Sequence, residues 1–279
     1  MSAGISIAAS GAARRTESQG VIVEIGGIPI LLRSGDADFR AMIEQRYAGF
    51  LNPSAHPAYE FGIYLEPPPA TAPDEDAHVF RDGSLWRFER GDFRAEWDAE
   101  ARRGYVRQSA NPYAIDAVLR IAHSLVLADE GGFLVHAASA VRGGRAFLFA
   151  GVSGAGKTTL SRLAPSDATV LTDEISYVRR SGPHYWGYGT PFAGELARVG
   201  ANVSAPLDTL FFLVQGPVNR IEPIGQLAAA GELLRHTLFF AHDSELVKQV
   251  FHSALEFVSR VNVARLVFTP DARAWEMVG

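Results

Sequence analysis

A glycine-rich segment in the middle of the chain places the strongest constraint on how the chain can fold. Residues 147–162, FLFAGVSGAGKTTLSR, contain the pattern G-x-x-x-x-G-K-[ST] in full. A β-forming run precedes the pattern and a helix-forming run follows it, which is the strand–loop–helix setting of a phosphate-binding loop. The segment therefore predicts an α/β unit that binds a nucleoside triphosphate.

Each residue of this loop has an expected role. Backbone N–H groups of the loop are expected to surround the β-phosphate, beside a helix N-terminus. Lys157 is expected to bridge the β- and γ-phosphates, and the Thr158 hydroxyl to hold Mg²⁺. The alternative is a glycine-rich turn that binds no ligand. The expected cofactors are ATP and Mg²⁺, and the expected nucleotide-binding residues are Gly151, Val152, Ser153, Gly154, Ala155, Gly156, Lys157, Thr158 and Thr159.

Two adjacent acids, Asp173 and Glu174, follow the loop in the run VLTDEIS. A β-rich run that ends in these acids places a carboxylate beside the phosphate loop, where such an acid holds the metal. Neighbouring side chains of a strand point to opposite faces, but twist at a strand end can bring both toward the phosphates. Asp173 is then a candidate general base and Glu174 a metal ligand. In the alternative, one acid holds the metal and the other is a solvated surface residue.

His136 lies in FLVHAASAV, the β-rich run before the strand of the loop. Taken alone, a histidine among apolar residues is more often a hydrogen-bonded core residue than a catalytic one. The sequence pattern around it therefore leaves its role open.

Together, the His-Ala strand, the short glycine-containing turn, the loop and the acidic pair resemble HPr kinase/phosphorylase. The wider group includes the HPr-kinase-like peptide kinases found with lasso-peptide biosynthesis. The resemblance covers residues 132–177 well and the rest of the C-terminal half loosely. It implies a fold similar to the nucleotide core of phosphoenolpyruvate carboxykinase. It also implies catalytic roles for His136 and Lys157, and for Asp173 as the base on an acceptor serine, while Glu174 stands where the family has a second Asp.

The chain departs from HPr kinases beyond the acidic pair. Their E-x-R-G-x-G segment has only a weak counterpart, with altered spacing, in the run Glu195-Leu-Ala-Arg198-Val-Gly200, and a Pro-Gly-Arg-Asn segment is absent. Glu195 is the candidate residue of an active-site loop here, although a plain β-turn explains the surrounding WGYGTPFAGEL equally well. These departures predict a one-way kinase that acts on something other than HPr.

The chain divides into differently built parts. We expect a disordered tail over residues 1–20, a small β-rich N-terminal domain over 21–110, and the P-loop α/β kinase domain over 111–279. Glycine-centred hairpins at Gly26–Gly27 and at Gly91 mark the N-terminal domain.

The second part is expected to open with a helix that Asn111 caps and that Gly131–Gly132 ends. Strands and helices then alternate, with TVLTDEISYV as one β-rich run, GQLAAAGELLRHTLFF and DSELVKQVFHSALEFVSR as helices, and VARLVFTP as a last strand.

The composition limits which classes of binding partner and which cellular compartment we expect. A net charge of -5 and a pI of about 5.9 provide no overall positive field for nucleic acid or anionic membranes. No apolar run is long enough to span a bilayer, and the N-terminus lacks the signal-peptide pattern, so we expect a cytoplasmic protein without a membrane partner. The absence of cysteine excludes disulfides and thiolate metal sites. The oligomeric state stays open, a homo-oligomer included.

The sequence therefore predicts an ATP-dependent serine kinase whose substrate is a peptide or small protein bearing an acceptor serine, including a lasso-type precursor peptide. One alternative is a nucleotide-binding regulator or scaffold that hydrolyses ATP slowly. Another is a kinase of a free small metabolite, which would use the same site and differ only in its acceptor.

Overall fold

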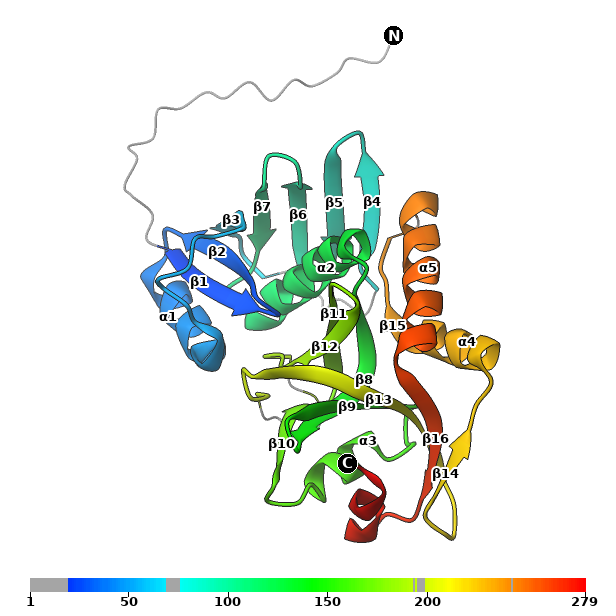
Figure 1. Ribbon diagram of the computed structural model, residues 1–279. Helices are drawn as coiled ribbons and strands as arrows, with labels where there is room; N and C mark the ends of the chain where they lie inside the picture. The colour runs from blue at the N-terminus through cyan, green and yellow to red at the C-terminus, as the bar shows by residue number, and fades with distance from the viewer. Residues whose placement is uncertain (1–19, 69–75, 193, 195–198, 242) are drawn as a thin grey trace, which may run out of the picture.

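The computed structural model describes residues 20–68, 76–192, 194, 199–241 and 243–279. Within these ranges the chain is a mixed α/β structure with one sheet of seven strands and one of nine (Figure 1). Of the tail expected over residues 1–20, only Gly20 is described, and it begins the first strand. No helix of the described part is long and apolar enough to cross a membrane.

The seven-stranded sheet is built from the N-terminal part of the chain, in the order β1-β2-β3-β7-β6-β5-β4. Its strands are β1 (Gly20–Ile25), β2 (Ile28–Ser34), β3 (Tyr59–Leu65), β4 (His78–Asp82), β5 (Leu85–Arg90), β6 (Phe93–Asp98) and β7 (Arg103–Gln108). Helix α1 (Ala37–Arg46) and the 3-10 turn η1 (Ala48–Phe50) follow β2.

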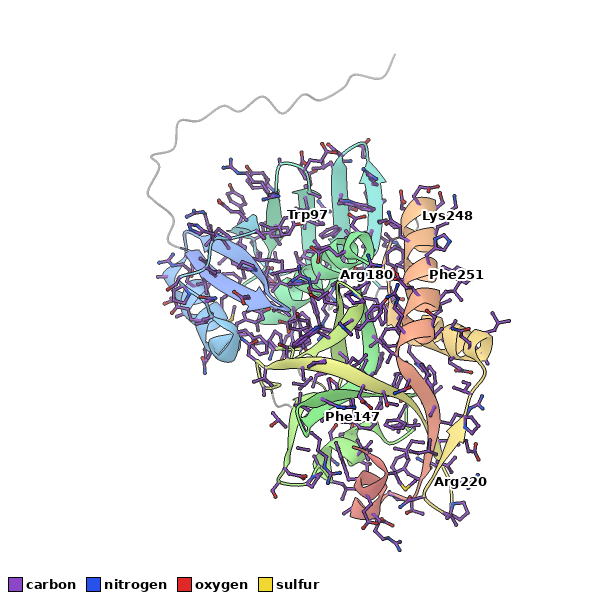
Figure 2. The ribbon with its side chains drawn as sticks, viewed as in Figure 1. Trp97, Phe147, Arg180, Arg220, Lys248 and Phe251 are labelled. Carbon is purple, nitrogen blue, oxygen red and sulfur yellow. The ribbon has the colours of Figure 1, made fainter. Side chains whose placement is uncertain are left out.

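Both predicted hairpins are present, since β1 pairs with β2 and β5 pairs with β6 in antiparallel register. In the second hairpin Trp86 lies opposite Trp97, and both indole side chains are buried together with Phe88 and Phe93. Alternate residues of a strand share a face, so these four aromatic rings form one apolar face of the sheet. Figure 2 shows Trp97 in the part of the molecule that the seven-stranded sheet forms.

Helix α2 (Pro112–Glu130) lies between the two sheets (Figure 1). Asn111 Oδ1 accepts a hydrogen bond from the N–H of Tyr113, and Gly131 ends the helix in the left-handed region with φ 75°. Most side chains of α2 are buried, in one cluster with residues of the seven-stranded sheet and with Leu134 and Tyr177 of the other. The boundary expected at residue 110 is thus crossed by a continuous apolar core, and the division into domains stays a prediction.

The nine-stranded sheet runs in the order β10-β8-β11-β12-β13-β16-β14, with β9 paired to β8 and β13 and with β15 paired to β8. Its strands are β8 (Phe133–Arg142), β9 (Arg145–Ala150), β10 (Ala168–Thr172), β11 (Ile175–Ser181), β12 (His184–Tyr188), β13 (Ser204–Gln215), β14 (Arg220–Pro223), β15 (Thr237–Leu238) and β16 (Asn262–Phe268). The helices of this part are α3 (Lys157–Arg162), α4 (Gln226–His236) and α5 (Ser244–Arg260), and the 3-10 turn η2 (Ala272–Met277) ends the chain.

Two predicted elements differ from the structure. The run TVLTDEISYV is not one strand but two, because the chain turns at Asp173 and Glu174 between β10 and β11. Thr172 Oγ1 accepts hydrogen bonds from the N–H groups of Glu174 and Ile175 at 3.2 and 3.3 Å. These two N–H groups therefore keep a hydrogen-bond partner at the turn between the two strands. The helix expected over GQLAAAGELLRHTLFF stops at His236, since the next two residues pair with β8.

Strand β8 organises the region of the predicted site. In the described part of the chain it pairs with β9, β10, β11 and β15. Its His136 lies opposite Ile175, the first residue after the acidic pair. This register brings a residue of one strand beside two acids that follow it by almost forty positions in the sequence.

Candidate functional site

The glycine-rich loop connects β9 to α3, as the sequence predicts. Gly154 and Gly156 have φ values of 77° and 108°, a region that side-chain-bearing residues rarely adopt. A Cβ atom at Gly156 would also lie 2.5 Å from Cζ of Phe268. The loop can therefore keep this path only with glycine at position 156, where the backbone enters α3.

Lys157 is buried within this loop, with 8% of its surface exposed. Its Nζ donates hydrogen bonds to the carbonyl oxygens of Gly151, over 2.7 Å, and of Val152, over 3.2 Å. These carbonyls hold the ammonium group against the loop, so the cation is fixed before any anion arrives. A fixed cation loses little side-chain freedom when it binds a phosphate.

The acidic pair lies in the turn between β10 and β11. Asp173 is buried, with 3% exposed, whereas the side chain of Glu174 is 31% exposed. Both carboxylates line the same pocket as the Thr158 hydroxyl. Neither acid is therefore a solvated surface residue remote from the other.

The segment after β12 lies on this acidic turn. The N–H of Gly194 donates to Asp173 Oδ1 over 3.2 Å, and the buried Thr190 donates its hydroxyl to the carbonyl oxygen of Ile175 over 2.8 Å. A Cβ at Gly194 would come within 2.6 Å of Glu174 Oε2. The hydrogen bond from the backbone to Asp173, next to Glu174, thus depends on the absence of a side chain at position 194.

His136 faces the acids and is not a core residue. Its Nε2 lies 3.6 Å from Glu174 Oε1, and 45% of its side chain is exposed. Burial lowers the pKa of His136, Glu174 opposes this, and the positive charges of Lys157 and Arg120 lower the pKa further. The imidazole is therefore favoured in its neutral form, in which one ring nitrogen donates a hydrogen bond and the other accepts one.

These side chains surround one pocket of about 300 Å³. It is lined by His136, Ser153, Gly154, Gly156, Lys157, Thr158, Asp173 and Glu174. The structure thus brings together the residues expected to bind phosphate, to hold metal and to accept a proton. The oxygen atoms of Thr158 and Glu174 suit Mg²⁺, which prefers few protein ligands and completes its shell with water and phosphate oxygens. Among the described residues, no three His, Asp or Glu side chains gather into a metal site of their own.

Four of the expected nucleotide-binding residues lie outside the lining of this pocket. Val152 is exposed, Ala155 is buried in an apolar cluster, and Thr159 is half-buried on α3. Gly151 contributes through its carbonyl oxygen, which accepts from Lys157. The expected loop residue Glu195 lies outside the described residues.

A family model described as SynChlorMet cassette protein ScmC matches residues 113–279, well over half of the chain. The chain belongs to the ScmC family. The ScmC match begins in α2 and includes every residue that lines the pocket.

Comparison with solved structures gives a weaker result than the ScmC match. The HPr(Ser) kinase/phosphatase from Coxiella burnetii is similar with 13% identity and a TM-score of 0.26, over 48% of this chain and 84% of that one. No curated protein matches the chain.

Two residues of the ScmC-matched region that the sequence did not single out also lie near the site. His236 ends α4, and the next residue, Thr237, pairs with Val135, which places His236 beside His136 in the continued register. Burial lowers the pKa of His236, and so does the positive charge of Lys157.

Arg120 of α2 is the second of these residues. Its guanidinium lies 4.9 Å from the ring centre of Phe192, and its Nε is buried without a hydrogen-bond partner among the described residues. Burial lowers the pKa of Arg120, while the charges of Asp116 and Glu174 raise it. An arginine between the apolar residues Leu119 and Ile121 of this helix was the sequence signal that could have found it.

Proposed function

We propose that this protein is an ATP-dependent serine kinase of the HPr-kinase-like type, which transfers the γ-phosphate to a serine hydroxyl of a peptide or small protein. One observation carries the proposal. A fixed lysine, a hydroxyl suited to a metal, and two carboxylates with different surroundings line the same pocket. The residue pattern that resembles HPr kinases supports the same reaction.

In the proposed reaction the serine oxygen forms a bond to the γ-phosphorus while the bond from that phosphorus to the bridging oxygen of ADP breaks. The serine proton passes to the carboxylate of Asp173. A serine hydroxyl is a poor nucleophile at neutral pH, and a base of this kind contributes about 10² to 10⁴ in rate. The N–H of Gly194 holds Asp173 in place through Oδ1.

Lys157 supplies positive charge beside the transferring phosphate. Phosphoryl transfer depends mainly on positioning and on stabilising negative charge, and a fixed cation does both. Mg²⁺ held by Thr158 and Glu174 would neutralise charge on the phosphate oxygens. We assign His136 to the orientation of Glu174, because the two side chains lie 3.6 Å apart and the imidazole is favoured as neutral.

The decisive experiment measures phosphoserine directly. The family is described as part of a cassette, so peptides encoded beside the gene are the first acceptors to test. Each is incubated with the protein, ATP and Mg²⁺ and analysed by intact mass. Asp173→Asn keeps the size of the side chain but cannot take the proton. We expect it to bind ATP–Mg²⁺ nearly normally and to transfer phosphate at least about a hundredfold more slowly.

Asp82→Asn is the matched control, because Asp82 lies in the hairpin of β4 and β5 with 68% of its side chain exposed. Wild-type transfer in Asp173→Asn would refute the base assignment. Slow ATP hydrolysis with no phosphorylated peptide, in the wild type itself, would favour the regulator. Phosphate on a free metabolite alone would reassign the acceptor.

A further inference from the structure

A second and larger pocket lies beside the candidate site. Its volume is about 920 Å³, and it is bounded by the second half of α3, by β10 and by residues 199–201. Alternate residues of β10, Ala168, Val170 and Thr172, line it, as expected for one face of a strand. A volume in the upper range of ligand pockets leaves room for several side chains.

Asp173 is the residue that lines both pockets. On one side its neighbours are Lys157 and Thr158, and on the other they are Thr172 and Gly200. A base must lie within hydrogen-bond reach of the proton that it takes. Because the serine oxygen must also reach the γ-phosphorus, an acceptor whose flanking residues lie in the larger pocket would place its hydroxyl in the smaller pocket, beside Asp173 and the phosphate loop.

The lining of the larger pocket favours a peptide over a nucleoside. It contains no aromatic ring on which adenine could stack, and most of its side chains are small, among them Ala164, Ala168 and Ala201. Arg162 is its one basic residue; the side chain is exposed, and no carboxylate of the described residues forms an ion pair with it. Nearby Asp167 is paired with Arg142 over 2.9 Å instead.

We propose that this pocket binds the segment that flanks the acceptor serine, with small side chains against β10 and an acidic side chain facing Arg162. The inference rests on the proposed kinase function and deepens it by assigning the class of acceptor. Acceptors with acidic residues near the serine are then better substrates than acceptors with basic ones.

Two synthetic peptides test the charge preference: Ac-Ala-Asp-Ala-Ser-Ala-Asp-Ala-amide and the same peptide with lysine in place of both aspartates. Phosphoserine formation gives kcat/KM for each, and calorimetric titration in the presence of a non-hydrolysable ATP analogue and Mg²⁺ gives binding independently of transfer. We expect kcat/KM of the acidic peptide to exceed that of the basic peptide by about fivefold, the upper range for an exposed charge pair.

Two variants locate the effect. Arg162→Glu should reverse the preference, in favour of the basic peptide, through the KM of the peptide and not the KM of ATP. Val199→Trp, at a residue 42% exposed, should weaken both peptides by filling the pocket. Lys248→Glu is the control for charge reversal, because Lys248 lies on α5, far from α3 in the view of Figure 2. It should leave both peptides unchanged.

The outcomes separate this inference from the proposed function. Transfer that is indifferent to peptide charge and to both variants would overturn the pocket assignment while leaving the kinase intact. A rise in the KM of ATP in Arg162→Glu would assign the pocket to the nucleoside instead. Binding of the acidic peptide without any phosphoserine would overturn the kinase proposal, and the acceptor role of the pocket with it.

Discussion

Gly194 donates its N–H to Asp173 Oδ1 over 3.2 Å and leaves no room for a side chain against the neighbouring acid. A Cβ at this position would lie 2.6 Å from Glu174 Oε2 and 2.8 Å from Glu174 Cβ. The geometry of both carboxylates is therefore tied to one backbone position that lies far from them in sequence.

Gly194→Ala should displace the acids and slow phosphate transfer by about tenfold to a hundredfold, the range expected for a misplacement of about 1 Å. Steady-state assays measure transfer, and nucleotide titration shows whether ATP still binds. Gly49→Ala is the control, because a Cβ at Gly49 meets nothing within 4 Å. Unchanged kinetics in Gly194→Ala would contradict the tight packing inferred at the acidic turn.

Lys157→Ala should lower kcat/KM by roughly two to three orders of magnitude, since a cation beside the transferring phosphate is worth about 3 to 4 kcal/mol at the transition state. Circular dichroism should show a retained fold, because the hydrogen bonds from Nζ to the carbonyl oxygens of Gly151 and Val152 lie within the loop itself. Lys248→Ala removes the other lysine of the chain and should change neither property. Equal activity of the two variants would rule out the phosphate role of the loop.

Removal of Mg²⁺ with excess chelator should abolish transfer, and added Mg²⁺ should restore it. Glu174→Gln should raise the Mg²⁺ concentration for half-maximal activity by at least about tenfold, because it weakens an oxygen ligand. Glu245→Gln, with 74% of the side chain exposed on α5, serves as the control. Transfer that persists in the chelator would exclude a metal held by Thr158 and Glu174.

His123 links stability to pH. It is fully buried, its Nδ1 lies 3.1 Å from Tyr177 Oη, and burial lowers its pKa to about 3, with a further contribution from Arg179. As pH falls below about 6.5, the unfolded chain binds a proton that the folded chain does not. The free energy of unfolding should thus fall from about pH 7 toward pH 3 by an amount on the order of a few kcal/mol.

Urea unfolding at pH 7 and pH 5 measures this effect. His123→Gln cannot titrate, so its free energy of unfolding should depend less steeply on pH than that of the wild type. His252→Gln changes an exposed histidine on α5 and should keep the wild-type slope. Parallel pH profiles for His123→Gln and the wild type would refute the role of His123.

Structural features that depend on residues close by in the sequence, such as helix ends and tight turns, could be predicted. Asn111 and Gly131 mark the ends of α2, and the glycines of the loop mark the turn from β9 into α3. In each case the physical cause, a capping side chain or a positive φ, lies within a few residues of its effect. Strands β4 and β7 were not predicted. Their sequences, HVFRD and RGYVRQ, are short and carry many polar residues, and they join the sheet because they pair with neighbouring strands.

The rest of the candidate site depends on long-range register. His236 comes near His136 only because β15 pairs with β8 across about a hundred residues of sequence. Arg120 comes near Glu174 only because α2 lies between the two sheets, and Phe192 positions its guanidinium. No local pattern contains such pairings, so sequence reasoning found the acids and the loop but not these two neighbours.

The continuous apolar core around α2 has a consequence for how the molecule unfolds. Exposing the seven-stranded sheet would also expose α2 and Tyr177, which belong to the same cluster. Neither half can then melt while the other keeps its packing, so heating should reveal a single cooperative transition rather than two. A chain cut at residue 110 would keep α2, most of whose side chains are buried, with the face that packs on the seven-stranded sheet left in water, and would be expected to aggregate.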